Sequence, residues 1–105
     1  MREILPSHIV VSLAGHDRGR LYHVLRVDGE CALVADGKIR TVQRPKRKKL
    51  RHVAYAGQSD SPAARKLAAG EEPTSREIRE SIAAFRDGRA FYHRGGETAW
   101  QKTMS

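Results

Sequence analysis

The chain has 105 residues, a formal net charge of +8 and a single cysteine. A chain of this length forms one small domain with its own core plus a short appendage. One cysteine excludes an internal disulfide, which suits a reducing compartment, so we expect a cytoplasmic protein. Residues 1–6 contain no apolar run long enough for a signal peptide or a membrane span, and we expect no membrane association.

The apolar pattern predicts five short strands, over residues 8–14, 21–27, 30–35, 38–43 and 50–55. In the second of these the apolar residues lie three apart, which predicts a bend or a β-bulge. Two Asp-Gly dipeptides, at 28–29 and 36–37, predict tight hairpin turns of type I′. Pro45 interrupts the fourth strand. Five short strands close into a small barrel, which removes exposed sheet edges.

The C-terminal part has helical signals instead. Residues 62–69 have the composition of a short helix, with Ser61 as its N-cap. A capping box over 74–77 opens a second helix that ends at Gly88. We expect its apolar stripe to lie against the barrel or a partner, the stripe being Ile78, Ile82 and Phe85. The predicted organisation is a barrel over 7–55, a linker and helical extension over 56–92, and a disordered tail over 93–105. We expect the barrel to fold without residues 56–105.

Positive charge is concentrated in residues 44–52, which read Arg-Pro-Lys-Arg-Lys-Lys-Leu-Arg-His. This window supplies +6 of the net +8, and the other 96 residues carry 14 cations and 12 anions. Such a concentration is typical of a polyanion-binding surface, and nucleic acid is the polyanion that we expect. The alternative is a solvated loop without a partner. An anionic membrane is disfavoured, because Pro45 and a single large apolar residue do not make a basic amphipathic helix.

A second candidate element is the loop of residues 15–20. Its glycines, Gly15 and Gly19, permit close approach of the backbone to a ligand. Its basic side chains have the chemistry to contact phosphate or stack on bases, and they are His16, Arg18 and Arg20. The alternative is an ordinary hairpin turn in which Asp17 bonds to its own backbone.

Other chemistries lack a signal. The five histidines show no HxH or HxxxH spacing, so we expect no metal and no cofactor. Nothing resembles paired catalytic carboxylates, and Cys31 lies among apolar residues, as a core cysteine does. We therefore expect neither an enzyme nor a small-molecule substrate. Aromatic residues are few, which favours recognition of the RNA backbone over reading of single bases.

The segment 9–27 resembles a KOW motif, with Gly19 at the position of the motif's glycine. The continuations Val-Ala-Asp-Gly-Lys-Ile-Arg (34–40) and 44–53 are similar to the ribosomal-protein-like KOW family. That family includes large-subunit ribosomal proteins of the fourteen-e type and small bacterial relatives. The resemblance covers residues 7–55 and implies an SH3-like barrel that binds RNA. Ribosomal RNA is the RNA that the resemblance favours. The resemblance reaches the loop residues Gly15, Asp17 and Gly19 and the basic run, but not the helices.

The predicted RNA contacts are therefore His16, Arg18, Arg20, Arg44, Lys46, Arg47, Lys48, Lys49, Arg51 and His52. We expect the loop 15–20 and the run 44–52 to lie on one side of the barrel and to form one surface, with the run solvated. The competing hypothesis is a protein-interaction KOW module that binds ribosomal or polymerase proteins. An exposed stripe on the second helix would favour that hypothesis. DNA in place of RNA is a third possibility, because phosphate contacts alone do not distinguish the two.

Overall fold

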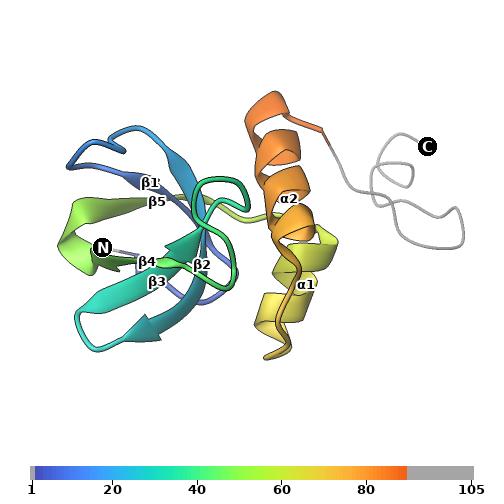
Figure 1. Cartoon of the computed structure of the whole chain (residues 1–105), viewed down its shortest axis with the longest axis horizontal. Coiled ribbons are helices and arrows are strands. Elements are labelled where there is room, and N and C mark those ends of the chain that lie inside the picture. The colour runs from blue at the N-terminus through green and yellow to red at the C-terminus, as the bar shows by residue number, and fades with distance from the viewer. Residues whose placement is uncertain (1, 90–105) are drawn as a thin grey trace, which may run out of the picture.

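A computed structural model describes residues 2–89, which form a mainly β fold of five strands, two α-helices and one 3₁₀ turn (Figure 1). The strands make one antiparallel sheet in the order β4-β3-β2-β1-β5. Residues 90–105 include the predicted tail and the end of the predicted extension, and both lie outside the described residues. The elements are β1 (Ile9–Ser12), β2 (Leu21–Asp28), β3 (Cys31–Ala35), β4 (Lys46–Lys49), η1 (Leu50–His52), β5 (Val53–Gly57), α1 (Pro62–Ala68) and α2 (Ser75–Asp87).

The predicted irregularity in the second strand is confirmed. The register of β2 against β3 shifts between Val24 and Arg26, so one extra residue, Leu25, bulges from the ladder. The bulge changes which side chains face the interior, because strand side chains alternate strictly only while the register is kept. The bulge therefore explains how apolar residues three positions apart can belong to one strand that stays paired along its length.

The hairpin between β2 and β3 lies where the first Asp-Gly dipeptide predicts it, but its type differs. A type I′ turn needs positive φ at both central residues. Only Gly29 has positive φ here, at 63°, whereas Asp28 and Glu30 do not. The type I′ prediction is therefore wrong, and a single glycine in the left-handed region makes this turn.

The predicted strand over 38–43 is also wrong, because residues 36–45 form an irregular loop. The carboxylate of Asp36 accepts hydrogen bonds from the backbone N–H groups of Lys38 (3.0 Å) and Arg40 (2.8 Å). The N–H of Val42 donates to Ser75 Oγ on α2 at 2.9 Å. These side chains accept hydrogen bonds from backbone N–H groups that, in a strand, would donate to the neighbouring strand.

The fourth strand begins only after Pro45 and consists of Lys46–Lys49. The basic run is thus an edge strand followed by the 3₁₀ turn η1, so the prediction of a loop is wrong. The predicted solvation holds for Arg44, Arg47, Lys49 and Arg51, which are exposed, but not for the buried Lys48. The fifth strand is correspondingly shorter at its start, with β5 beginning at Val53. Within the described part of the chain, strand β4 pairs only with β3, through Cys31–Lys49 and the three pairs that follow.

Two hydrophobic clusters lie on opposite faces of the sheet. The first is built by strand residues alone, namely Val10, Tyr22, Val24, Ala32, Val34 and Val53. The second joins the other face to both helices and contains Ala35, Val42, Ala63, Leu67, Ile78 and Ile82. Figure 1 shows α1 and α2 together at one side of the sheet. The helices therefore complete a layer of the core.

Helix α2 begins and ends as its sequence predicts. Thr74 and Glu77 form both hydrogen bonds of the capping box, and Gly88 ends the helix in the left-handed conformation. Ile78 and Ile82 are buried against the sheet, which confirms the predicted burial of the stripe. The half-buried Phe85 lies so close to Gly57 of β5 that a Cβ there would collide with its ring.

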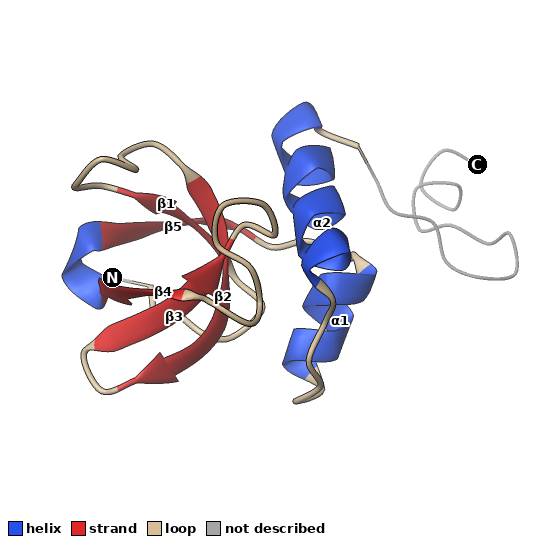
Figure 2. Cartoon of the chain, viewed as in Figure 1, coloured by secondary structure: helices blue, strands red, loops and turns tan. Residues whose placement is uncertain are grey.

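The sheet is open between its edge strands, since β4 and β5 do not pair with each other. The turn η1 joins them (Figure 2). It is held by the N–H of Leu50, which donates to Glu30 O at 2.8 Å, and by His52 O, which accepts from the N–H of Leu13 at 2.8 Å. Among residues 2–89, no helix has the length and apolar character needed to cross a membrane.

Candidate nucleic-acid interface

The loop of residues 15–20 connects β1 to β2 and is shaped by two glycines. Gly15 and Gly19 both have φ of 88°, a conformation that favours glycine over other residues. Backbone bonds from Gly19 N–H to Ser12 O (2.8 Å) and from Ser12 N–H to Arg20 O (3.0 Å) continue the pairing of the strands into the loop. The loop is thereby a defined structure that places Asp17 inward.

Asp17 is buried and receives four side-chain hydrogen bonds. One oxygen accepts from Ser12 Oγ (2.9 Å) and Lys48 Nζ (3.1 Å). The other accepts from the Tyr22 hydroxyl (2.6 Å) and Lys46 Nζ (3.1 Å). Burial alone would raise the pKa of this carboxyl, but the bonds from these four groups hold it well below its usual range. Asp17 therefore remains ionised, and it does not serve as a simple turn residue.

The same contacts raise the pKa of the Tyr22 hydroxyl. Burial contributes most, followed by the hydrogen bond to the Asp17 carboxylate and the charge of that carboxylate. Tyr22 consequently stays protonated and donates its proton to Asp17. Tyr22 belongs to the core, because only 1% of the residue is exposed.

Lys46 and Lys48 point to the interior side of β4, while Arg47 and Lys49 point outward. Lys48 is only 7% exposed, and its ammonium donates to Ala14 O (3.0 Å) as well as to Asp17. This arrangement engages Lys48 within the protein and leaves its side chain almost no exposed surface for a phosphate. Lys46 is 28% exposed at its side chain, so it reaches the surface beside its partner.

Asp17 brings the two predicted elements together. The loop 15–20 supplies the carboxylate and β4 supplies both lysines, so the two segments lie side by side, as expected. The predicted single surface is not formed, because the cations of the loop line a pocket that contains no residue of the basic run. The two lysines also extend from β4, at the edge of the sheet, to the end of β1 and the start of β2. The ion cluster therefore joins strands that no backbone ladder connects.

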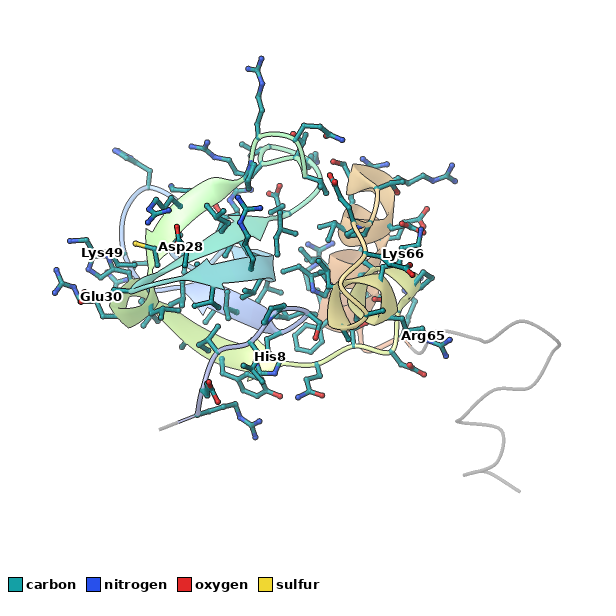
Figure 3. The ribbon with its side chains drawn as sticks, turned by 90° about the horizontal axis from the view of Figure 1, so that it is seen from below. His8, Asp28, Glu30, Lys49, Arg65 and Lys66 are labelled. Carbon is teal, nitrogen blue, oxygen red and sulfur yellow. The ribbon has the colours of Figure 1, made fainter. Side chains whose placement is uncertain are left out.

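The outward cations of the basic run are solvent-exposed. Arg47 pairs with Asp28 at 3.1 Å, and both side chains are more than half exposed, so the pair is screened by water. Figure 3 places Lys49 at the end of the sheet remote from α1, near Glu30. Within residues 2–89 no ion pair occupies Arg44, Lys49 or Arg51. His52 is half-buried beside them.

The remaining predicted contacts face a different opening. His16, Arg18 and Arg20 line a pocket of about 580 Å³ between their loop, the loop that follows β3, and α2. Arg20 pairs with Asp36 at 3.3 Å. The same pocket is lined by cations that sequence reasoning missed, namely Lys38, Arg79 and Arg86.

A signal for two of these was present in the sequence. Arg79, Ile82, Ala83 and Arg86 follow the i, i+3, i+4, i+7 spacing of one helix face. The apolar stripe drew attention to Ile82 alone. Which loops lie against that face depends on tertiary packing, so the sequence could identify the basic face but not the pocket.

A buried serine–histidine pair lies under α2. His23 and Ser81 are both 0% exposed, and His23 Nε2 lies 2.7 Å from Ser81 Oγ. His23 Nδ1 lies 3.1 Å from the carbonyl oxygen of Ser7, which fixes the proton on Nδ1 and makes Nε2 the acceptor. Burial lowers the pKa of His23 to about 4, so the ring is neutral. The pair connects sheet to helix and lacks access to a substrate.

Among the described residues, no three histidine, cysteine, aspartate or glutamate side chains come together as metal ligands. Cys31 is half-buried at the start of β3, so it is less enclosed than the core position expected.

No known family model matches this chain, and no curated protein matches it significantly. The functional assignment accordingly depends on the chemistry of the surface described above.

Proposed function

We propose that this protein is a non-catalytic RNA-binding protein that contacts ribosomal or other structured RNA through the phosphate backbone. The observation that carries the proposal is the cluster at Asp17. It fixes the loop 15–20 against β4 and uses the inward lysines for structure, while the cations beside them point to solvent. A rigid basic surface binds a polyanion with a smaller entropic cost than a flexible tail.

The fold that we propose is an SH3-like barrel of the KOW type. Its support is the strand order β4-β3-β2-β1-β5 with a short 3₁₀ turn between the last two strands. In this interpretation η1 and the lysine–Asp17 bonds bridge the gap that the ladder leaves open. The resemblance of residues 7–55 to the KOW family adds to this proposal.

The charge distribution supports RNA as the partner. Several basic side chains form no ion pair within residues 2–89, so they are available to neutralise phosphates and release counterions. Arginine among them offers bidentate hydrogen bonds to phosphate oxygens. They are Arg18, Arg26, Lys38, Arg40, Arg44, Lys49 and Arg51.

The alternative of a protein-interaction module has less support. It was favoured only if the stripe on α2 were exposed, and Ile78 and Ile82 are buried against the protein's own sheet. The surface near β4 is also densely basic, which a protein partner does not require. We therefore propose RNA as the first ligand to test.

The test compares two double variants with the same loss of charge. Arg47→Gln with Lys49→Gln removes outward cations of β4, whereas Arg65→Gln with Lys66→Gln removes cations of α1, which Figure 3 places far from Lys49. The first pair should weaken binding to a structured RNA by about 5- to 30-fold, as expected for two lost charged contacts. The second should change it little. Equal losses of affinity in the two double variants would contradict the proposed surface. Tighter binding to a matched DNA would identify DNA, and not RNA, as the ligand.

A further inference from the structure

We propose that the pocket between the loop 15–20, the loop 36–40 and α2 binds one nucleoside monophosphate unit. Under the proposed function this unit is an unstacked nucleotide of the bound RNA, and that part of the inference rests on it. A free nucleotide would present the same chemistry. The pocket has a volume of about 580 Å³, which lies within the usual range for sites of small ligands.

The exposed charge of the pocket is positive. Five cationic side chains line it against two carboxylates, giving a formal excess of +3. Both carboxylates, Asp17 and Asp36, are only 8% exposed. Asp36 accepts from two backbone N–H groups and from Arg20, while Asp17 is held by the four groups described above. The anionic charge is thus satisfied inside the protein, and the cations meet the solvent.

Three of the cations are suited to a phosphate. Arg18 and Lys38 form no ion pair within the described chain, and both are exposed. Arg79 uses one guanidinium nitrogen to donate to Gly37 O at 3.3 Å, and no carboxylate pairs with it among residues 2–89. A guanidinium has five N–H donors, so Arg79 can hold a phosphate while remaining anchored.

The pocket also has an apolar lining, which distinguishes it from a plain basic patch. Leu21, Ile82 and Ala83 contribute to its wall, and Ile82 is 6% exposed. A phosphate alone gains nothing from these side chains. A nucleotide does, because its base has a flat apolar face that packs on aliphatic groups while its phosphate reaches the arginines.

The walls of the pocket are fixed against one another. Gly37 is packed against the start of α2 so tightly that a Cβ there would collide with backbone atoms of Ser75 and Arg79. Val42 N–H also donates to Ser75 Oγ. Such preorganisation lowers the entropic cost of binding. It also makes α2 part of the binding surface, which the sequence had separated from the RNA-binding segment.

The first experiment titrates the intact protein, observed by amide NMR, with uridine and adenosine 5′-monophosphates and with the corresponding nucleosides. The nucleotides should shift the amides of Leu21, Ile82 and Ala83, and the nucleosides should bind at least about tenfold more weakly because they lack the phosphate. Arg79→Gln with Arg86→Gln should weaken nucleotide binding by about tenfold or more. The matched control, Arg65→Gln with Arg76→Gln, changes the same charge outside the pocket and should not. Shifts confined to other residues would overturn the proposal.

The second experiment identifies the source of the nucleotide. A blunt RNA hairpin is compared with the same hairpin carrying a short single-stranded overhang. An RNA source predicts tighter binding of the overhang by the wild type and loss of that advantage in the Arg79/Arg86 variant. Nucleotide shifts in the pocket without any RNA binding would support a free nucleotide and contradict the proposed function. RNA binding with no nucleotide shifts and no overhang effect would overturn the pocket and leave the proposed function standing.

Discussion

The carboxylate of Asp17 lies 3.1 Å from the ammonium of Lys48, and more than nine-tenths of each side chain is buried. This pair joins the loop between β1 and β2 to the edge strand β4. Three further side chains, Ser12, Tyr22 and Lys46, also donate hydrogen bonds to this carboxylate. A buried ion pair of this kind adds little stability over an apolar contact, but removing one partner leaves the other charge uncompensated.

Replacing Asp17 by Asn should therefore destabilise the protein strongly. The variant leaves Lys48 buried without a counter-charge, and we expect the free energy of unfolding to fall by about 3–5 kcal/mol. Urea denaturation of the purified variant measures this. Asp28→Asn is the matched control, because its partner Arg47 is exposed to solvent and the pair is screened. Asp17→Asn and Asp28→Asn proteins of equal stability would contradict the structural role of the cluster.

The sequence predicted the elements whose signals are local. The capping box of α2 was correct because Thr74 and Glu77 satisfy each other's backbone within four residues. The bulge in β2 was correct because apolar spacing records it directly. The strand β4 was missed, because Lys46–Lys49 contains no apolar residue and the sequence therefore does not show which of its side chains face inward. Two of those lysines are interior residues because they pair with Asp17, about 30 positions away in the chain.

The candidate site was predicted in part for the same reason. Its loop and its basic run are contiguous in sequence, so both were found. The pocket also needs α2 and the loop that follows β3, and no local pattern indicates that they meet. Strand 38–43 was wrong because Asp36 and Ser75 capture its backbone donors, and the Ser75 contact spans 33 positions.

His23 should make stability depend on pH. Its pKa is about 4 in the fold and 6.5 ordinarily, so the unfolded chain takes up a proton over a range in which the folded chain does not. The free energy of unfolding should thus fall as the pH decreases from about 6.5 to about 4, by roughly 3 kcal/mol in total. Burial lowers the pKa of His8 as well, which acts in the same direction.

Denaturation of the wild type and of His23→Gln at several pH values tests this prediction, together with NMR titration of the His23 ring. The variant should show a flatter dependence on pH in that range. A ring that titrates in the folded protein at its ordinary pKa would show that the prediction is wrong. Protonation of Asp17 should reduce the free energy of unfolding only at lower pH, because the pKa of this carboxyl in the folded protein lies below its ordinary value.

Gly37 should tolerate no side chain. A Cβ at this position would lie 2.6 Å from the backbone nitrogen of Arg79 and would also collide with Ser75 O, and φ is +80°. Gly70 has the same φ but nothing within 4 Å of an added Cβ. We expect Gly70→Ala to cost about 1 kcal/mol through backbone strain, and Gly37→Ala to cost about 3 kcal/mol more through the collision. Thermal or urea unfolding gives both values, and similar losses would contradict the close packing of this loop on α2.

Removing the helices should unfold the sheet. Ile78 and Ile82 cover one of its faces, and each contributes about 1.5–3 kcal/mol through burial. Loss of Ser81 also leaves the buried Nε2 of His23, which accepts a hydrogen bond, without a donor. We expect a fragment ending at Gly57, the last residue of β5, to lack a cooperative unfolding transition. This is the opposite of what the sequence suggested.

Circular dichroism and amide NMR of that fragment provide the measurement. A dispersed NMR spectrum and a sharp transition would restore the boundary near residue 55 and make the helices an accessory element. A Ser81→Ala variant of the full chain gives a milder comparison, with an expected loss of about 1–3 kcal/mol.

In the proposed function, exposed cations around Asp17 bind the phosphates of RNA. The most direct measurement is the affinity of the intact protein for a structured RNA over a range of salt concentrations. Four to six phosphate contacts predict a slope of about −3 to −5 when the logarithm of the binding constant is plotted against the logarithm of the salt concentration. Binding with a slope near zero would contradict phosphate recognition by these cations.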